Sequence, residues 1–275
     1  MITHQKPSLS SHISALLSAG RIVFTSDDIA RELGVGHGAF LDAAGRLRQR
    51  KVLVNPRQGF YVVVPPQHAS WGAPPPSWYI DALMQHEGAP YYVGLLKAAE
   101  LHGAAHQAVM EFQVVTAKRL PKITAGRSRI AFYYRKDLAP VSLGIEGRKT
   151  DTGSMKISSP ALTALDLLRY PHAAGGLDNI ATVLSELADM VDVAQLAELS
   201  DAFERPVVQR LGYMLERLGY AGKAEQMNIA LEARGNVFWT ELDRAEARDP
   251  DFAREPVERD ARWRVIVRRM PEVDE

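Results

Sequence analysis

Residues 24–53 read FTSDDIARELGVGHGAFLDAAGRLRQRKVL, and this stretch decides the fold of the N-terminal part of the chain. Thr25 is a candidate helix N-cap, with Asp28 three positions later in a weaker form of the capping box. The helix that begins there is short, because Gly34 ends it. A second helix is predicted from residue 37 to about residue 50, because its apolar side chains recur on one face.

The second helix is amphipathic, and two strand-like runs follow it. Its buried side is predicted to consist of Phe40, Ala44 and Leu47. The runs VLV (52–54) and FYVVV (60–64) are rich in β-branched and aromatic residues, and the turn NPRQG separates them. A further helix is predicted before the quoted stretch, over residues 9–19. Three helices followed by a hairpin are typical of a winged helix-turn-helix.

A proline-rich segment, PPQHASWGAPPPSW at residues 65–78, follows the predicted hairpin. Its five prolines fix backbone angles and remove hydrogen-bond donors, so we predict a stiff, extended linker. The predicted domains are therefore a winged helix-turn-helix over residues 1–66, a linker over residues 67–77 and a larger domain over residues 78–275.

The larger domain is predicted to be α+β and rich in helices. The sequence patterns indicate helices at 77–88 and 91–106, strands at 110–117 and 128–135, a strand ending at 155–158, and a helix over 161–170 opened by Pro160. Helices dominate from there to about residue 219, and RWRVIV (262–267) is a last predicted strand. The fold class predicted for the whole chain is thus α+β.

Length and composition describe a chain that can bury a sizeable core, with 275 residues of which 46% are hydrophobic. The absence of cysteine excludes disulfides and thiolate metal sites and fits a reducing compartment. The sequence shows neither a secretory leader nor a run of about 20 apolar residues. We therefore expect a soluble, cytoplasmic protein.

The net charge of zero conceals a division along the chain. Residues 1–150 contain 18 Lys and Arg against 10 Asp and Glu, whereas residues 151–275 contain 15 against 23. A basic half attracts phosphate, so this division favours docking on nucleic acid through one face. The alternative is that both sets are scattered charges in solvent.

Polar and basic residues occupy the outer side of the second helix in the quoted stretch and the segments after it. In a helix-turn-helix this helix enters the major groove, while the wing lies along the backbone or in the minor groove. The candidate DNA-binding residues here are His37, Asp42, Arg46, Arg48, Arg50, Lys51, Arg57 and Gln58.

Base reading by this helix is expected to depend on few residues. Gly38 and Ala39 offer no side-chain hydrogen bonds, so close backbone approach or DNA shape would have to contribute. Asp42 has two interpretations, as an acceptor from a cytosine amino group or as a solvated helix charge. A module that contacts only proteins is the alternative for the whole segment.

Signals for catalysis or metal binding are weak. His102 and His106 are one helical turn apart, but HGAAH lacks the glutamate of HExxH and no third ligand is identifiable. The phosphate-binding pattern GxxxxGK[ST] and the nucleophile pattern GxSxG are both missing. We therefore predict no catalytic residue, no metal and no cofactor.

The order of these features resembles the AbiE-type antitoxins, the AbiEi family of type IV toxin–antitoxin systems in bacterial phage-defence operons. The resemblance lies in FTSDDIARELGV, RLRQRKVL through GFYVVVP, YYVGLLKAAELHG, EFQVVTAKRLPK, MKISSPALTALDLL and VVQRLGYMLERLG. Each piece is degenerate, whereas their order along most of the chain is more specific.

The resemblance implies an antitoxin that binds double-stranded operator DNA, represses its own operon at inverted repeats and counteracts a nucleotidyltransferase-like toxin in abortive infection. It also implies antagonism without a stable toxin complex. Because the sequence has no long heptad segment, a homodimer is expected to be weak or to depend on DNA.

A second basic cluster gains a role from this resemblance. AbiE-type antitoxins are thought to use a positive face of the C-terminal domain together with the winged helix in binding DNA. The resemblance therefore adds the candidates Lys118, Arg119, Lys122, Arg127 and Arg129, and Arg135 and Lys136 continue the cluster. Alternate members on two neighbouring strands are expected to share one face. The alternative is an ordinary charged sheet surface.

Two other classes of function stay open at this point. A DNA-processing enzyme targeted by a winged helix needs acidic residues and a lysine on adjacent strands to bind magnesium, and the predicted strands carry basic residues instead. A ligand-sensing transcriptional regulator needs an apolar pocket with a few convergent polar groups, which a sequence does not reveal.

Overall fold

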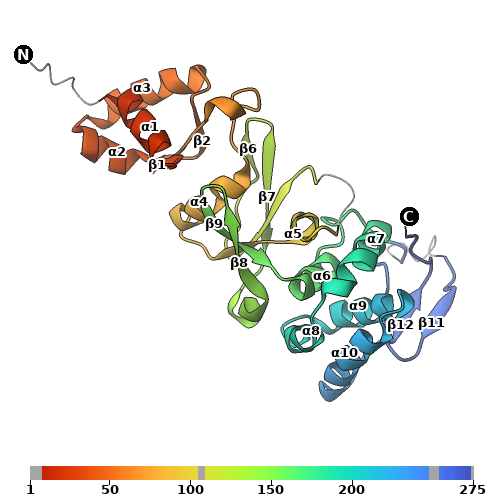
Figure 1. Cartoon of the computed structure of the whole chain (residues 1–275). Coiled ribbons are helices and arrows are strands. Elements are labelled where there is room, and N and C mark those ends of the chain that lie inside the picture. Colours follow the sequence, from red (N-terminus) through yellow and green to blue (C-terminus); the bar gives the residue numbers. More distant parts are fainter. Residues whose placement is uncertain (1–7, 105–108, 248–253, 274–275) are drawn as a thin grey trace, which may run out of the picture. The chain divides into compact units, whose positions relative to one another are not determined.

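A computed structural model describes residues 8–104, 109–247 and 254–273 (Figure 1). The fold is mixed α+β, which confirms the predicted class at this level. By their contacts the described residues group into two compact units: the first contains those up to residue 91 together with 110–136 and 147–156, and the second contains the others. The predicted domain division at residues 67–77 stays a prediction, because grouping by contacts does not measure which part folds alone.

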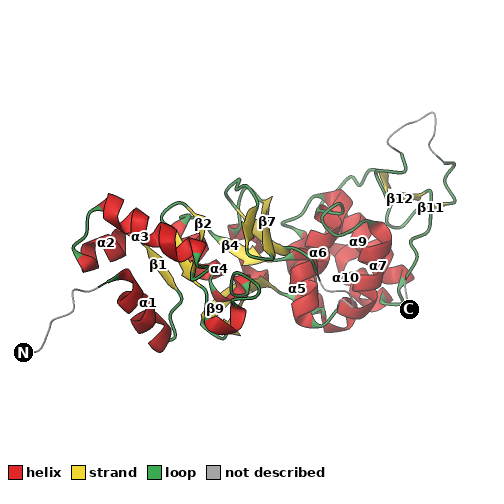
Figure 2. Cartoon of the chain, turned by 90° about the horizontal axis from the view of Figure 1, so that it is seen from above, coloured by secondary structure: helices red, strands yellow, loops and turns green. Residues whose placement is uncertain are grey.

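The first unit begins with three helices and three strands, which we call the N-terminal module (residues 8–64). Its elements are α1 (Leu9–Ser18), β1 (Val23–Thr25), α2 (Ser26–Leu33), α3 (His37–Gln49), β2 (Leu53–Arg57) and β3 (Phe60–Val63). The strands form an antiparallel sheet in the order β1-β3-β2. Figure 2 shows β1 and β2 beside the three helices. The three predicted helices are confirmed, whereas β1 is too short to show periodicity in the sequence.

Local signals explain the boundaries of α2 and α3. The Thr25 hydroxyl accepts a hydrogen bond from the Asp28 N–H at 3.2 Å and donates to the Asp28 carboxylate at 2.7 Å, so it caps α2 as predicted. Gly34 ends α2 in the left-handed conformation, with φ of 61°. Helix α3 then buries the predicted residues Phe40, Ala44 and Leu47.

Aromatic side chains fill the centre of the module. The Phe24 ring of β1 stacks on the Tyr61 ring of β3 with centroids 5.4 Å apart. The Phe40 ring of α3 meets the same tyrosine edge-on at 5.3 Å. These contacts hold α3 against the sheet and leave its opposite side to solvent.

The β2–β3 hairpin is longer than predicted. The predicted turn covers residues 55–59, but β2 continues to Arg57, so only Gln58 and Gly59 form the tip. The side-chain amide of Asn55 donates a hydrogen bond to the Phe60 carbonyl at 2.7 Å and so draws the predicted turn residues into the strand pairing. The strand therefore passes through a register irregularity instead of ending.

The proline-rich segment after the module contains two short 3-10 helices in place of the predicted extended chain. They are η1 (Pro66–His68) and η2 (Pro76–Trp78). The Trp71 carbonyl accepts a hydrogen bond from the Arg127 N–H at 2.9 Å. A Cβ on Gly126, where φ is +57°, would lie 2.2 Å from that carbonyl oxygen, so only glycine permits this approach. The segment is thus packed within the first unit and leads to α4 (Ile80–His86).

Six strands form the second sheet, in the order β6-β7-β5-β4-β9-β8. They are β4 (Tyr91–Val93), β5 (Phe112–Thr116), β6 (Ile123–Ala125), β7 (Ser128–Tyr134), β8 (Ile145–Thr150) and β9 (Gly153–Ser158). β5 and β7 pair in parallel, whereas β6 and β7 form an antiparallel hairpin in which Thr124 faces Arg129. β5, β7 and β9 correspond to predicted strands.

The helix predicted over residues 91–106 is wrong at its start. Tyr91–Val93 form β4, because aromatic and β-branched side chains suit a buried strand. Helix α5 (Leu95–His102) begins after Gly94 and ends at Gly103, where φ is 85°. His106 of the predicted histidine pair lies outside the described residues.

The helices of the second unit surround α6 (Pro160–Arg169), in which residues 161–168 are buried on all sides. Ser159 caps it, and Pro160 occupies its first turn as predicted. The neighbouring elements are η3 (Ala139–Gly144), α7 (Leu177–Leu187), η4 (Ala188–Met190), α8 (Val193–Ser200) and α9 (Arg205–Arg217), and α10 (Ala221–Ala233) packs on α8 and α9.

A small sheet completes the second unit. Its strands are β10 (Thr240–Glu241), β11 (Glu258–Asp260) and β12 (Val265–Val267), in the order β10-β12-β11. β12 confirms the last predicted strand. None of the helices in the described ranges combines the length and the apolar character that crossing a membrane requires.

Candidate nucleic-acid interface

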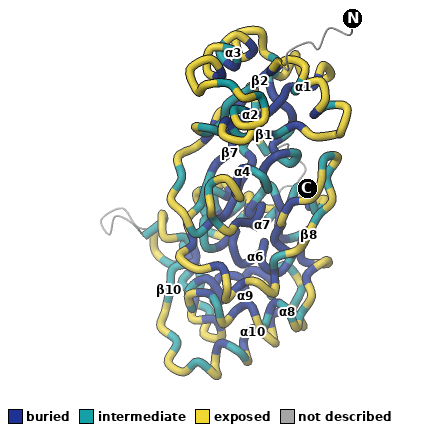
Figure 3. Tube along the Cα trace, turned by 90° about the vertical axis from the view of Figure 1, so that its left-hand side faces the viewer, coloured by how far each residue is buried: buried dark blue, intermediate teal, exposed yellow. Residues whose placement is uncertain are grey.

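Helix α3 turns a polar side to solvent, and this side is the first part of the candidate interface. Because Phe40, Ala44 and Leu47 face the module's core, the predicted residues His37, Asp42 and Arg46 lie on the exposed side. Figure 3 shows this alternation of buried and exposed positions along α3. The exposed side offers imidazole, carboxylate and guanidinium groups, each able to exchange hydrogen bonds with base edges or phosphates.

The N-terminus of α3 is built from small residues. Gly36 occupies the N-cap position and has no side chain with which to cap the helix. Apart from adjacent residues and the helix's own backbone, no described atom lies within 4 Å of a Cβ built on Gly36 or Gly38. The first turn of α3 thus has free space beside it and no side-chain cap, and the helix dipole there favours an anionic ligand.

Three exposed cations follow at the other end of α3. They are Arg48, Arg50 and Lys51. Lys51 adopts the left-handed conformation with φ of 59°, and the Val52 N–H donates back to the Leu47 carbonyl at 2.9 Å. This tight reversal ends the helix and carries the chain into β2, so the basic residues stay at the surface.

A groove of about 570 Å³ lies beside these cations. The C-terminal half of α3 forms one wall, β2 forms the floor, and the turn between β6 and β7 forms the other wall. The lining residues are Gly45, Arg48, Gln49, Leu53, Val54, Asn55, Pro56, Thr124, Ala125 and Gly126. The first unit thus brings the N-terminal module and the β6–β7 turn together along one groove.

The two predicted residues of the hairpin tip are not alike. Gln58 is exposed. Arg57 is only 18% exposed, and its Nε donates to the Glu87 carboxylate at 2.7 Å. Its guanidinium also lies over the Phe132 ring, at 5.6 Å from the centroid. Arg57 therefore faces its own chain.

Glu87 also binds Lys118, whose Nζ donates to the carboxylate at 3.0 Å and to the Glu87 carbonyl at 2.9 Å. Burial raises the pKa of Glu87, but the hydrogen bonds and charges of Lys118 and Arg57 outweigh burial and hold that pKa below its ordinary value. One carboxylate thus neutralises part of the charge of two predicted DNA-binding residues.

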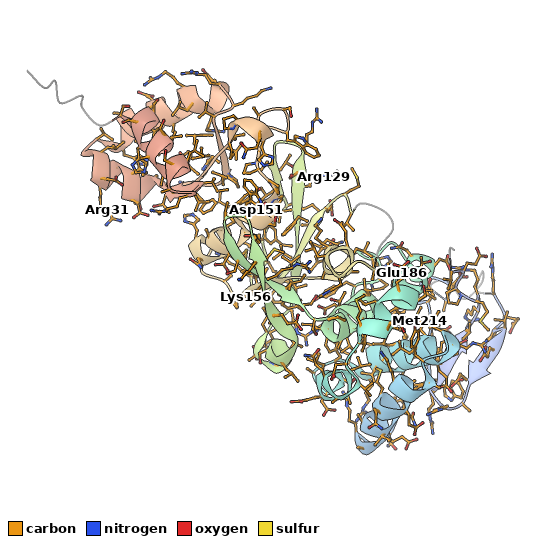
Figure 4. The ribbon with its side chains drawn as sticks, viewed as in Figure 1. Arg31, Arg129, Asp151, Lys156, Glu186 and Met214 are labelled. Atoms are coloured by element: carbon orange, nitrogen blue, oxygen red, sulfur yellow. The ribbon has the colours of Figure 1, made fainter. Side chains whose placement is uncertain are left out.

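The other members of the second basic cluster divide between the two faces of the β6–β7 hairpin. Arg129 pairs with Thr124 across the hairpin, and both are exposed (Figure 4 labels Arg129). Lys122 is exposed and donates to Glu111 at 2.8 Å, which raises the pKa of its ammonium group. Arg119 stacks over the Tyr134 ring at 4.2 Å. Because residues 129 and 134 point to opposite faces of β7, the cluster does not share a single face.

Arg127 and the two residues that continue the cluster occupy separate positions. Arg127 is exposed in the β6–β7 turn, with its guanidinium 5.8 Å from the centre of the Trp71 ring. Lys136 is exposed, whereas Arg135 is buried with 4% exposure. Arg135 is therefore not part of the surface.

Sequence reasoning missed three residues of this region. Leu41 is 45% exposed on α3, and Gln49 is exposed where α3 lines the groove. The spacing of Asp42, Arg46 and Gln49 places them on one helical stripe, which is a signal present in the sequence. Glu87 carries no such signal, because its partners lie 30 and 31 residues away.

The second unit contains a buried polar cluster with no sign of a metal centre. The Tyr92 hydroxyl donates to the Asp166 carboxylate at 2.6 Å, and Asp166 is fully buried. The ring Nε2 of His102 lies 2.8 Å from the Ser158 carbonyl oxygen. Over the described ranges, no three His, Asp or Glu side chains are grouped as metal ligands.

Comparison with known proteins supports one family. Residues 92–217 match the family model described as the AbiEi antitoxin C-terminal domain. The crystal structure of the Rv2827c protein from Mycobacterium tuberculosis has a similar fold, with a TM-score of 0.68 at 18% sequence identity, covering 96% of this chain and 92% of that chain. No curated protein matches the chain.

Proposed function

We propose that this chain, an AbiEi family antitoxin by its match over residues 92–217, binds the DNA of its own operon and represses it. The N-terminal module is then a winged helix-turn-helix in which α3 is the reading helix. The order of helices and strands, with β1-β3-β2 as its sheet, supports this assignment. A role in phage defence and a cytoplasmic location, beside the operon DNA, belong to the same proposal.

The observation that carries the proposal is the groove between α3 and the β6–β7 turn. Arg48 of α3 lines it. Arg46 on the same helix, and Arg127 and Arg129 in and after the β6–β7 turn, are exposed cations on the elements that form the groove. Residues 110–136 contain seven Lys and Arg against one Glu, so the far wall belongs to a strongly basic segment of the chain. Phosphate neutralisation by such groups supplies most of the affinity of a DNA-binding protein.

Base reading falls to the exposed side of α3. His37, Leu41 and Asp42 lie near its N-terminal end, the part that a reading helix places deepest in the major groove. The small residues of the N-terminus allow the backbone to approach the duplex closely. Two protomers would occupy the arms of an inverted repeat and form a dimer only on the DNA.

The second part of the proposal concerns the toxin. The AbiEi domain supports an antitoxin role, and we propose that it counteracts a nucleotidyltransferase-like toxin encoded by the neighbouring gene, without forming a stable complex with it. The chain would do so without catalysis of its own. In this proposal the exposed cations of the groove bind operator DNA and take no part in counteracting the toxin.

Two experiments test these parts separately. Binding of the full chain to duplex DNA from upstream of its operon is measured at several salt concentrations, and a steep loss of affinity with salt is expected. Absent or salt-insensitive binding would contradict the repressor role. Co-expression with the neighbouring gene tests the antitoxin role, which fails if that gene is not toxic or if its toxicity is unrelieved.

A further inference from the structure

The tip of the β2–β3 hairpin is fastened to the chain's own residues at several points. Besides its bond to Glu87, Arg57 donates from Nη2 to the Pro121 carbonyl at 2.6 Å. Pro121 directly precedes the β6–β7 hairpin, and Phe132, over which Arg57 stacks, belongs to β7. The guanidinium of Arg57 therefore connects the end of β2 to three places. They are Glu87 after α4, Pro121 before β6, and Phe132 on β7.

The backbone of the tip is held as well. His86 Nε2 lies 3.0 Å from the Gln58 carbonyl oxygen, and the His86 ring packs on the Phe60 ring at 5.4 Å. From the other side, the Ser26 N–H donates to the Gly59 carbonyl at 2.8 Å. A hairpin held in this way is not free to reorient toward a duplex.

The cations of α3 and the arginine at the tip of the β2–β3 hairpin differ in their exposure to solvent. Arg46 and Arg48 are exposed, whereas the side chains of Arg57 and Glu87 are 18% and 12% exposed. Phosphate binding by Arg57 would have to break a largely buried ion pair and leave Glu87 with Lys118 alone. Breaking such a pair is strongly unfavourable, since it leaves a charge without compensation.

The position of Arg57 relates it to the groove. β2 forms the groove floor, and the β6–β7 turn forms its far wall. Because Arg57 ends β2 and contacts both Pro121 and Phe132, it connects the floor to the base of the hairpin whose turn forms the far wall. The contact therefore lies where it can set the spacing between α3 and the basic β6–β7 hairpin.

We propose that Arg57 and Glu87 are positioning residues for DNA binding, which hold α3 and the β6–β7 hairpin at the spacing that a duplex requires. The tip of the β2–β3 hairpin thus holds the parts of the first unit in place and does not contact DNA. The β6–β7 hairpin contacts the phosphates, which is the role that a wing would otherwise have. This inference rests on the proposed DNA binding and reassigns Arg57, which the sequence alone predicts to be a DNA contact.

The slope of log K against log salt separates a positioning residue from a phosphate contact. Each phosphate contact that is lost lowers the magnitude of this slope by about 0.9. We expect Arg57→Ala to weaken binding about tenfold through lost preorganisation while leaving the slope unchanged. Arg46→Ala is the matched control, and its slope is expected to fall by about 0.9. The probe is duplex DNA from upstream of the operon, with the full chain.

Two conservative variants keep the test decisive if Arg57→Ala does not fold. Arg57→Lys retains the charge but not the forked geometry, so a positioning role predicts weaker binding, whereas binding equal to that of the unaltered chain would mean that only the charge of Arg57 matters. Glu87→Gln is expected to weaken binding as well. A thermal melt of each variant confirms that it is folded under the conditions of the titration.

Several outcomes would overturn the inference. A slope lowered by Arg57→Ala as much as by Arg46→Ala would make Arg57 a phosphate contact. Tighter and more salt-dependent binding by Glu87→Gln would make Glu87 a competitor of the DNA instead of a support. If the unaltered chain binds no DNA, the proposed function fails and this inference fails with it. Either of the two variant results would contradict only the inference and leave the proposed DNA binding in place.

Discussion

Gly212 of α9 lies directly against the indole ring of Trp263, so closely that a Cβ on Gly212 would come within 2.1 Å of the ring. Trp263 is fully buried, and its Nε1 donates to the Glu216 carboxylate at 2.6 Å. Its backbone N–H donates to Asp260 at 2.7 Å. The glycine thus lets the last described segment of the chain pack on α9, which belongs to the matched family domain, whereas Trp263 lies beyond that domain.

We expect Gly212→Ala to destabilise the second unit by about 1–3 kcal/mol or more, because the added methyl group overpacks against a buried ring. Chemical denaturation measures the effect. Gly222→Ala is the matched control, since within the described chain no atom lies within 4 Å of a Cβ there and the position is helical. The control should be neutral or stabilising by up to about 1 kcal/mol. Equal stability of the two variants would contradict the packing seen at Trp263.

Gly38→Glu should change stability and DNA binding in opposite directions. A side chain at Gly38 meets open space within the described chain, so we expect the helix to gain about 1 kcal/mol from the lost glycine. The carboxylate also favours the positive N-terminal end of α3. In a complex it would face phosphates, and like charges brought together are expected to cost about tenfold or more in affinity.

Gly38→Gln is the control for this variant, because it restores helix propensity without adding charge. A thermal melt and a DNA titration are measured on both variants. If Gly38→Glu binds DNA as well as Gly38→Gln does, the N-terminus of α3 is not near the phosphates.

Glu87 predicts an acid-dependent loss of stability. Its pKa in the folded chain lies below the ordinary value of 4.5, because the hydrogen bonds of Lys118 and Arg57 outweigh the opposing effect of burial. A carboxyl group with a depressed folded pKa stabilises the fold above its ordinary pKa, and this contribution is lost as pH falls through the lower folded value. Unfolding measured from neutral pH to acid should therefore show it.

The variant Glu87→Gln isolates this contribution. We expect the unaltered chain to be more stable than the variant at neutral pH and the difference to narrow as pH falls below 4.5. A difference that stays constant, or that grows toward acid, would mean that Glu87 is not a charged partner of Arg57 and Lys118.

Arg129→Ala should weaken DNA binding and lower the salt slope by about 0.9, because Arg129 is an exposed cation of the β6–β7 hairpin. Lys149→Ala is the charge-matched control. Lys149 is exposed on β8, and the strand order places β8 and β6 at opposite edges of the sheet. Salt titrations of both variants give the comparison, and equal losses would show that only overall charge matters.

Much of the N-terminal module follows from signals between close neighbours in the sequence. The cap at Thr25, the left-handed stop at Gly34 and the buried side of α3 each depend on residues within one or two turns. Such contacts are favoured wherever these residues occur at these spacings. The exposure of Asp42 and Arg46 follows in turn, because a helix with one buried side has one free side, whereas His37 is exposed at the first position of the helix.

Other elements were harder to predict for local reasons. β1, β4 and β6 have three residues each, which is too short for a period to be recognised. The helical interpretation of residues 91–93 was wrong because aromatic residues beside a helix-forming run fit the pattern of a helix and that of a strand. Pairing with neighbouring strands decided between them.

What the sequence by itself determined is therefore the helices of the N-terminal module and the longer elements elsewhere, the AbiEi resemblance and the supply of positive charge in the N-terminal half. Only the tertiary structure decided which of those charges face solvent. Arg57 is largely buried against Glu87, which it shares with the exposed Lys118, and Arg119 stacks on Tyr134, on the face of β7 opposite to that of Arg129. The physical reason is that the charge of a side chain follows from the residue type. The residue that pairs with that charge is determined by strand pairing and packing between segments that are distant in the chain.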